Sequence, residues 1–194
     1  KFCDAVHEQE AVAVFQLTHL NHMFSPSSVP STELYDQVPH TMRDEQIEFV
    51  LDTYAAAAEK ALEAGADGVE IHCAHDTVPQ TFMSPATNKR TDKWGGDAEA
   101  RTLFIREGLA RIRAVVGDKM AVGIRVNGME SRQGGYDLLA FREMIYIIAE
   151  TGLIDFVNVD IGHCWGRHAY VPPSYHAPAE NREAGKALKT GLNE

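Results

Sequence analysis

Residues 65–96, GADGVEIHCAHDTVPQTFMSPATNKRTDKWGG, decide the fold of this 194-residue chain. Their first part contains a short apolar run at 69–72, which is typical of a buried strand. That run ends at His72, His75 follows three residues later, and a long polar loop comes next. A strand that delivers two imidazoles into a loop is typical of an active site.

Apolar runs and helical spacings alternate along the rest of the chain. Runs rich in apolar and β-branched residues predict four strands, at 11–17, 69–72, 120–126 and 154–161. Helical spacing predicts helices between them, the first starting at a near capping box of Thr41 and Asp44 and ending at Gly65. Further helices are predicted at 98–116, 138–150 and 179–189, and the end of another within 1–10. This alternation predicts an α/β fold with a parallel sheet covered by helices.

The polar residues of the predicted strands bear on which α/β fold this is. Gln16, His72, Arg125 and Asp160 each fall at the carboxyl end of a strand, where barrel enzymes keep their chemistry. Open sheets also bind ligands at that edge, so this placement alone leaves a doubly wound sheet possible. No G-x-G-x-x-G or Walker sequence follows a strand, which argues against dinucleotide and P-loop folds.

Composition narrows the class of partner. A formal net charge of −10 disfavours nucleic acid and anionic membranes, so a small-molecule ligand is expected. The three cysteines show no C-x-x-C spacing, which fits a reducing cytoplasm and no metal site built from thiolates. No apolar run approaches the ~20 residues of a membrane span. The chain begins with Lys1 rather than Met, as expected of a fragment or a processed product.

His72 and His75 would point to opposite faces of a regular strand, so they converge only if the chain leaves the strand between them. Converging imidazoles would hold an anionic or carbonyl-bearing ligand or position an amine. The alternative is a pair of structural, hydrogen-bonded histidines. A zinc site completed by His163 or His168 is a weaker alternative, because the spacing matches no common zinc motif.

For two further side chains, the sequence likewise leaves open whether they bind a ligand or only stabilise the fold. A buried guanidinium at Arg125 needs either an anionic ligand or a carboxylate such as Glu70 or Asp160. Trp165 would face a cationic substrate with its π system or pack within a loop.

Taken together, these motifs resemble the Old Yellow Enzyme superfamily of flavin-dependent barrels. Its hallmark reads D-G-V-E-I-H, then A-H, then S-P-x-x-N-x-R-T-D-x-Y/W-G-G, and 67–96 match it in order, with Q-L-T-H at 16–19 and V-G-I-R at 122–125. The resemblance implies a TIM (β/α)₈ barrel, of which residues 1–194 form one partial flavin-binding domain with about four central βα units, strands 3 to 6. It also implies FMN as cofactor, with Gln16 on the pyrimidine edge and Arg125 near N1 and O2.

Within the superfamily, Thr77 stands where ene-reductases usually carry a proton-donating tyrosine, and threonine is too weak an acid for that task. The segment is similar to the trimethylamine, dimethylamine and dimethylglycine branch, which passes a hydride from an N-methyl carbon to flavin N5. That resemblance implies catalytic roles for His72 and His75 and a substrate site with Trp165 as cation wall. His168 stands where some members have an acidic residue, so a carboxylated N-methyl amine is the expected substrate.

Two alternatives stay open: an NAD(P)H-dependent ene or 2,4-dienoyl-CoA reductase, and a non-catalytic half-barrel that serves in assembly. A complete barrel needs about 250 residues, so this chain is expected to pair with the remainder of a larger chain or with copies of itself. In the amine branch, parts outside the barrel also supply iron–sulfur cysteines. No metal ligands are assigned within residues 1–194.

Overall fold

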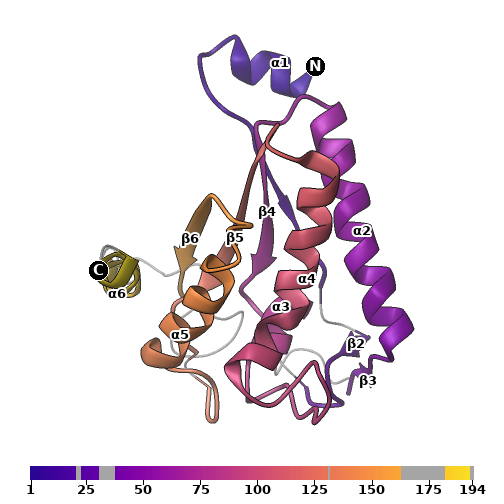
Figure 1. Cartoon of the computed structure of the whole chain (residues 1–194), viewed down its shortest axis with the longest axis vertical. Coiled ribbons are helices and arrows are strands. Elements are labelled where there is room, and N and C mark those ends of the chain that lie inside the picture. Colours follow the sequence, from indigo (N-terminus) through magenta and orange to yellow (C-terminus); the bar gives the residue numbers. More distant parts are fainter. Residues whose placement is uncertain (21–22, 31–37, 131, 163–181, 193–194) are drawn as a thin grey trace.

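A parallel sheet forms the centre of the computed structural model, which describes residues 1–20, 23–30, 38–130, 132–162 and 182–192. Its four strands lie in the order β1-β4-β5-β6 (Figure 1). Their bounds are Val14–Leu17 for β1, Gly68–Cys73 for β4, Ala121–Asn127 for β5 and Phe156–Asp160 for β6. The order follows the sequence without reversal, as in the wall of a barrel.

Helices connect the strands as the alternation predicts. The long connections are α2 (Asp44–Glu63), α4 (Ala98–Val116) and α5 (Leu138–Ala149), while α1 (Phe2–His7) precedes the sheet and α6 (Arg182–Leu192) follows it. Among the described residues, no helix is both long enough and apolar enough to cross a bilayer. Each predicted strand and helix is present, although β1 starts three residues later than expected.

Three short elements were not predicted. The loop after β4 holds a helix, α3 (Val78–Met83), and two-residue strands β2 (Phe24–Ser25) and β3 (His40–Thr41) pair in parallel. The capping prediction at Thr41 is wrong, because Thr41 belongs to β3 and Arg43 caps α2. The Gln46 side chain accepts the Arg43 N–H at 3.0 Å, which completes the cap from inside the helix. Gly65 ends α2 with a φ of 83°, as predicted.

The two faces of the sheet differ in polarity. One face carries buried Val and Ile side chains that pack in the hydrophobic core with α2 and α4, including Val69, Ile71, Val122 and Ile124. Because side chains alternate along a strand, the opposite face carries the intervening residues. These are mostly polar: Gln16, Glu70, His72, Arg125, Asn158 and Asp160. The apolar face stabilises the fold, and the polar face is therefore available for a ligand.

Candidate functional site

The two predicted histidines converge at the carboxyl edge of the sheet. His72 lies in β4, the strand ends at Cys73, and His75 and Asp76 then adopt left-handed φ values of 54° and 62°. This turn brings the imidazole rings of His72 and His75 to 5.1 Å between centroids, edge to face. The predicted convergence is confirmed, and it comes about because the chain leaves the strand between the two residues.

Asp160, the last residue of β6, joins two other strand ends through one carboxylate. Nε of Arg125 donates to Oδ2 at 2.9 Å, Nη2 of Arg125 contacts the same oxygen, and Nε2 of His75 lies 3.2 Å from it. Burial acts to raise the pKa of Asp160, but the hydrogen bonds from His75 and Arg125 outweigh it and hold the pKa below its usual range. Of the partners considered for Arg125, Asp160 is the one observed, and 34 % of the arginine side chain remains exposed.

Glu70 ties two amides together on the polar face. Its Oε1 accepts from Nε2 of Gln16 at 2.7 Å, and its Oε2 lies 3.4 Å from Nδ2 of Asn158. Because a carboxylate only accepts, Glu70 directs the Gln16 amide nitrogen toward itself and the carbonyl oxygen away. Gln16 is thereby presented as a hydrogen-bond acceptor to a ligand on this face.

His72 is held in its neutral form. Burial, followed by the charges of His75 and Arg125, lowers its pKa to about 4. Its Nδ1 is buried and has no hydrogen-bond partner among the described residues. A neutral imidazole has one N–H donor and one acceptor nitrogen, so His72 is suited to orient a ligand rather than to protonate it at neutral pH.

Thr77 is directed away from this site. The side chain is fully buried, and its hydroxyl donates to the carbonyl oxygen of His72 at 2.6 Å. The hydroxyl is therefore committed to the backbone of the turn after β4, which gives a geometric reason, beyond acidity, why this position does not supply a proton.

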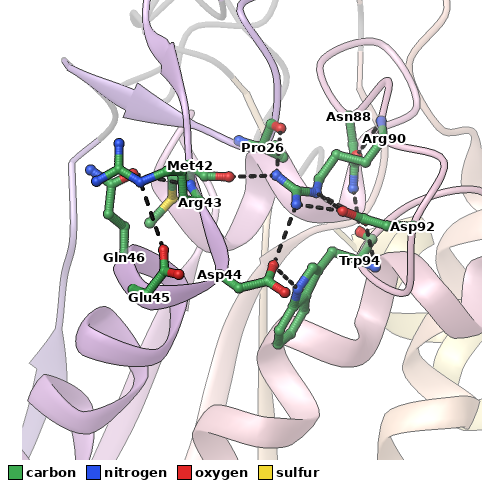
Figure 2. Close-up of polar contacts among 10 residues, drawn as sticks. All are labelled: Pro26, Met42, Arg43, Asp44, Glu45, Gln46, Asn88, Arg90, Asp92 and Trp94. Carbon is green, nitrogen blue, oxygen red and sulfur yellow. Dashed lines mark hydrogen bonds and ion pairs between the residues drawn. The ribbon is translucent and has the colours of Figure 1, made fainter.

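The polar loop that carried the resemblance is held by buried Asn88 and Trp94 and by Arg90, while Lys89, Thr91 and Lys93 are exposed. Figure 2 shows the Arg90 guanidinium between Asp92 and the ends of distant segments. Nη1 donates to the carbonyl oxygen of Met42 at 2.7 Å, Nε donates to Asp92 at 2.9 Å, and Nη2 lies 3.6 Å from Asp44. Asp44 also accepts from Nε1 of Trp94 at 3.1 Å. We call this set of five residues the Arg90 clasp; it fixes the loop against the start of α2.

The structure also identifies site residues that the sequence did not single out. Glu70 was considered only as a partner of Arg125, and Asp160 only as such a partner and as a polar residue at a strand end, although a carboxylate inside an apolar strand is a usable signal. The buried carboxyl of Glu130 faces Gln80, whose side chain binds the turn that contains His75 and Asp76. No pattern in the sequence linked Glu130 to that turn. Trp165 and His168, predicted to contact substrate, lie outside the described residues, as does His163.

Comparison with known proteins places these observations in one family. Residues 1–178 match the NADH:flavin oxidoreductase / NADH oxidase family. The chain is 32 % identical over 191 residues to the N,N-dimethylglycine/sarcosine dehydrogenase of Chromohalobacter salexigens, covering 91 % of this chain and 27 % of that protein. It is 35 % identical over 170 residues to a probable N-methylproline demethylase of Rhizobium meliloti, covering 82 % and 25 %.

A third relative combines two activities, and a solved structure identifies the architecture. The multifunctional alkene reductase/demethylase of Caballeronia cordobensis is 34 % identical over 173 residues, covering 84 % of this chain and 25 % of that protein. The Old Yellow Enzyme homologue of Zymomonas mobilis superposes with a TM-score of 0.74 at 25 % identity, covering 98 % of this chain and 63 % of that one. The described sheet is thus part of a TIM barrel, and the chain spans about a quarter of the length of these three curated relatives.

Proposed function

Because the chain belongs to the NADH:flavin oxidoreductase / NADH oxidase family of FMN-dependent oxidoreductases, we propose that its substrate is a small N-methylated amine. The observation that carries this proposal is the burial of Thr77, whose hydroxyl is bound to His72, since oxidative demethylation needs no proton donor there. The names of two relatives, a dimethylglycine/sarcosine dehydrogenase and an N-methylproline demethylase, support it. We also propose that β1, β4, β5 and β6 are strands 3 to 6 of the family barrel.

The polar face of the sheet fits FMN. Arg125 keeps part of its guanidinium exposed although Asp160 binds two of its nitrogens, and Gln16 presents its amide oxygen away from Glu70. The positive charge of Arg125 suits the anionic side of the flavin ring edge, and the amide oxygen of Gln16 suits the side that carries an N–H group. In this proposal Gln16 and Arg125 hold the flavin, while His72 and His75 contact the substrate.

The residues of the site would prepare the amine for oxidation. An alkylammonium must lose its N–H proton before its N-methyl C–H is oxidised, because the nitrogen lone pair supports the developing iminium. In this proposal His75, whose Nε2 lies 3.2 Å from the Asp160 carboxylate, takes that proton as a general base. When bound, FMN supplies the acceptor for the hydride of the N-methyl carbon. Water then hydrolyses the iminium to formaldehyde and the demethylated amine.

Other parts of the substrate site remain proposals from the sequence. Trp165 would face the alkylammonium, and His168 would bind a carboxylate on the same molecule, which favours N-methylated amino acids. We further propose a cytoplasmic enzyme in which these residues act together with the remainder of a larger chain or with other copies. An iron–sulfur cluster would belong to a region outside residues 1–194.

Alkene reduction is the second candidate function. The relative that is both an alkene reductase and a demethylase supports it. So does Asp76, beside His75, because burial raises the pKa of its carboxyl to about 6 and such an acid holds a proton in mildly acidic solution.

The test compares the two reactions on the FMN-loaded protein. Anaerobic mixing with dimethylglycine, sarcosine or N-methylproline is expected to bleach the flavin absorbance and release formaldehyde. Bleaching by NADPH with reoxidation by an enone, and no response to any amine, would instead assign the reductase activity. Failure to take up FMN at all would contradict both and favour the assembly role.

A further inference from the structure

The backbone that places His75 is unusual. His75 and Asp76 occupy consecutive left-handed conformations, with φ values of 54° and 62°. Residues with a Cβ adopt this region rarely and at an energetic cost, so such a turn persists only where neighbouring groups hold it. The question is which groups hold this one.

A side chain from α3 binds the turn directly. Oε1 of Gln80 accepts the backbone N–H of Asp76 at 2.6 Å, and the Gln80 side chain is 1 % exposed. A buried N–H needs a hydrogen-bond partner, and the Gln80 side chain supplies one. Gln80 therefore satisfies the N–H at the centre of the left-handed pair.

A second segment, between β5 and α5, orients Gln80. Nε2 of Gln80 lies 3.4 Å from Oε1 of Glu130 and 3.4 Å from the hydroxyl of Tyr136, both in that segment. Glu130 is fixed in turn, because its Oε2 accepts from Oγ of Ser84 at 2.6 Å and from the Tyr136 N–H at 3.1 Å. With two acceptors facing its nitrogen, the Gln80 amide must turn its oxygen toward the Asp76 N–H.

We propose that Gln80 and Glu130 are positioning residues for His75. Glu130 orients the Gln80 amide, and Gln80 holds the turn that brings the His75 imidazole against Asp160. The catalytic consequence rests on the proposed function, because it assumes that His75 serves the amine. The positional consequence does not depend on it.

The charges around Glu130 make this arrangement sensitive to pH. Burial raises the pKa of Glu130 to about 7, opposed by the Ser84 and Tyr136 hydrogen bonds and by Arg132, while Asp76 adds to the increase. Arg101 is the other cation near Glu130. When Glu130 is protonated, its carboxyl carries an O–H donor, and this donor competes with the N–H donor of Gln80 that faces it. The turn is therefore held most firmly above neutral pH, when Glu130 only accepts.

The test follows the His75 ring itself. In the full protein labelled with ¹⁵N-histidine, the ring signals of His75, assigned with H75N, are expected to shift in Q80M, which keeps the size of Gln80 but removes its three hydrogen bonds. At pH 8, where Glu130 is ionised, E130Q should shift the same signals in the direction seen in Q80M. If the protein turns over the amine, Q80M should lower kcat roughly tenfold or more with a smaller change in KM.

Two tyrosine variants provide a matched comparison. Y136F removes a hydroxyl that faces Gln80 and should shift the His75 signals, whereas Y54F removes a buried hydroxyl without a hydrogen-bond partner among the described residues and should leave them unchanged. Unchanged His75 signals in folded Q80M, or in folded E130Q at pH 8, would overturn the proposal. If Q80M does not fold, Y136F and E130Q still decide it. A protein inactive on amines would refute the proposed function but leave this readout intact.

Discussion

Nε2 of His75 and Oδ2 of Asp160 lie 3.2 Å apart, although one residue follows β4 and the other ends β6. The strand between them, β5, contributes Arg125 to the same carboxylate. One aspartate therefore connects three strand ends, and its charge determines how much positive potential the site presents.

Replacing that charge should change stability in a pH-dependent way. Because the pKa of Asp160 is lowered in the folded state, its contribution to stability is present above the ordinary value of 3.8 and is lost as pH falls below it. We expect D160N to lower the free energy of unfolding by about 1–3 kcal/mol at pH 7 and by less at pH 3. Urea unfolding at both pH values measures this, and an equal loss at both would contradict the assigned ion pairs.

The contribution of Glu130 to stability should depend on pH with the opposite sign to that of Asp160. Its folded-state pKa of about 7 lies above the ordinary 4.5, so the native state binds the proton more tightly and loses stability as pH rises from 4.5 to 7. E130Q removes this titration. The stability of the wild type relative to E130Q should fall by up to about 3 kcal/mol across that interval and stay level above it. A difference that is constant from pH 4.5 to 8 would show that Glu130 is ionised throughout.

The Arg90 clasp predicts a large difference between two arginines shown in Figure 2. Arg90 is 10 % exposed and binds carbonyl and carboxylate groups, whereas Arg43 is 75 % exposed and lies 3.7 Å from Glu45. We expect R90A to lower the free energy of unfolding by about 1–3 kcal/mol, because the carbonyl oxygen of buried Met42 and two exposed carboxylates lose their shared donor. R43A should change it by less than about 0.5 kcal/mol.

Conservative replacement refines this prediction. R90K keeps the charge but not the fork that reaches Asp92 and the Met42 carbonyl together, so it should recover less than half of the R90A loss. Thermal unfolding of R90A, R90K and R43A under one set of conditions makes the comparison. Full recovery in R90K would mean that charge alone accounts for the role of Arg90.

Much of the fold is predictable because local signals agree with the tertiary structure. Helix α4 has the predicted bounds, since Asp97 caps it through the Ala100 N–H and Gly117 closes it with a φ of 55°. Helix α3 was missed because it is short, begins with Val-Pro and is buried on all sides, which leaves no helical period to detect. Strands β2 and β3 have two residues each, too few for any pattern.

The candidate site was likewise predictable only in part. The sequence predicted that His72 and His75 would converge if the chain left the strand between them, and it does so after Cys73. Glu70, which binds Gln16, lies 54 residues from it in the sequence, and Glu130, which orients Gln80, lies 50 residues from it. These contacts depend on strand register and on loop packing, which sequence patterns do not encode for single polar residues. The sequence therefore predicted which side chains meet at the strand ends better than it predicted the contacts that hold them.

Thr77 allows the chemistry to be separated from the structure. T77V keeps the shape of the side chain but removes the hydroxyl that donates to the His72 carbonyl, so it should cost about 1 kcal/mol of stability. If the hydroxyl is only structural, kcat for amine oxidation should stay within about threefold of the wild type. T102V is the matched control, because Oγ1 of Thr102 is equally buried and donates to the Ala98 carbonyl within α4. A folded T77V protein whose kcat for enone reduction falls by about a hundredfold, with T102V unaffected, would assign the Thr77 hydroxyl a part in proton transfer and favour alkene reduction.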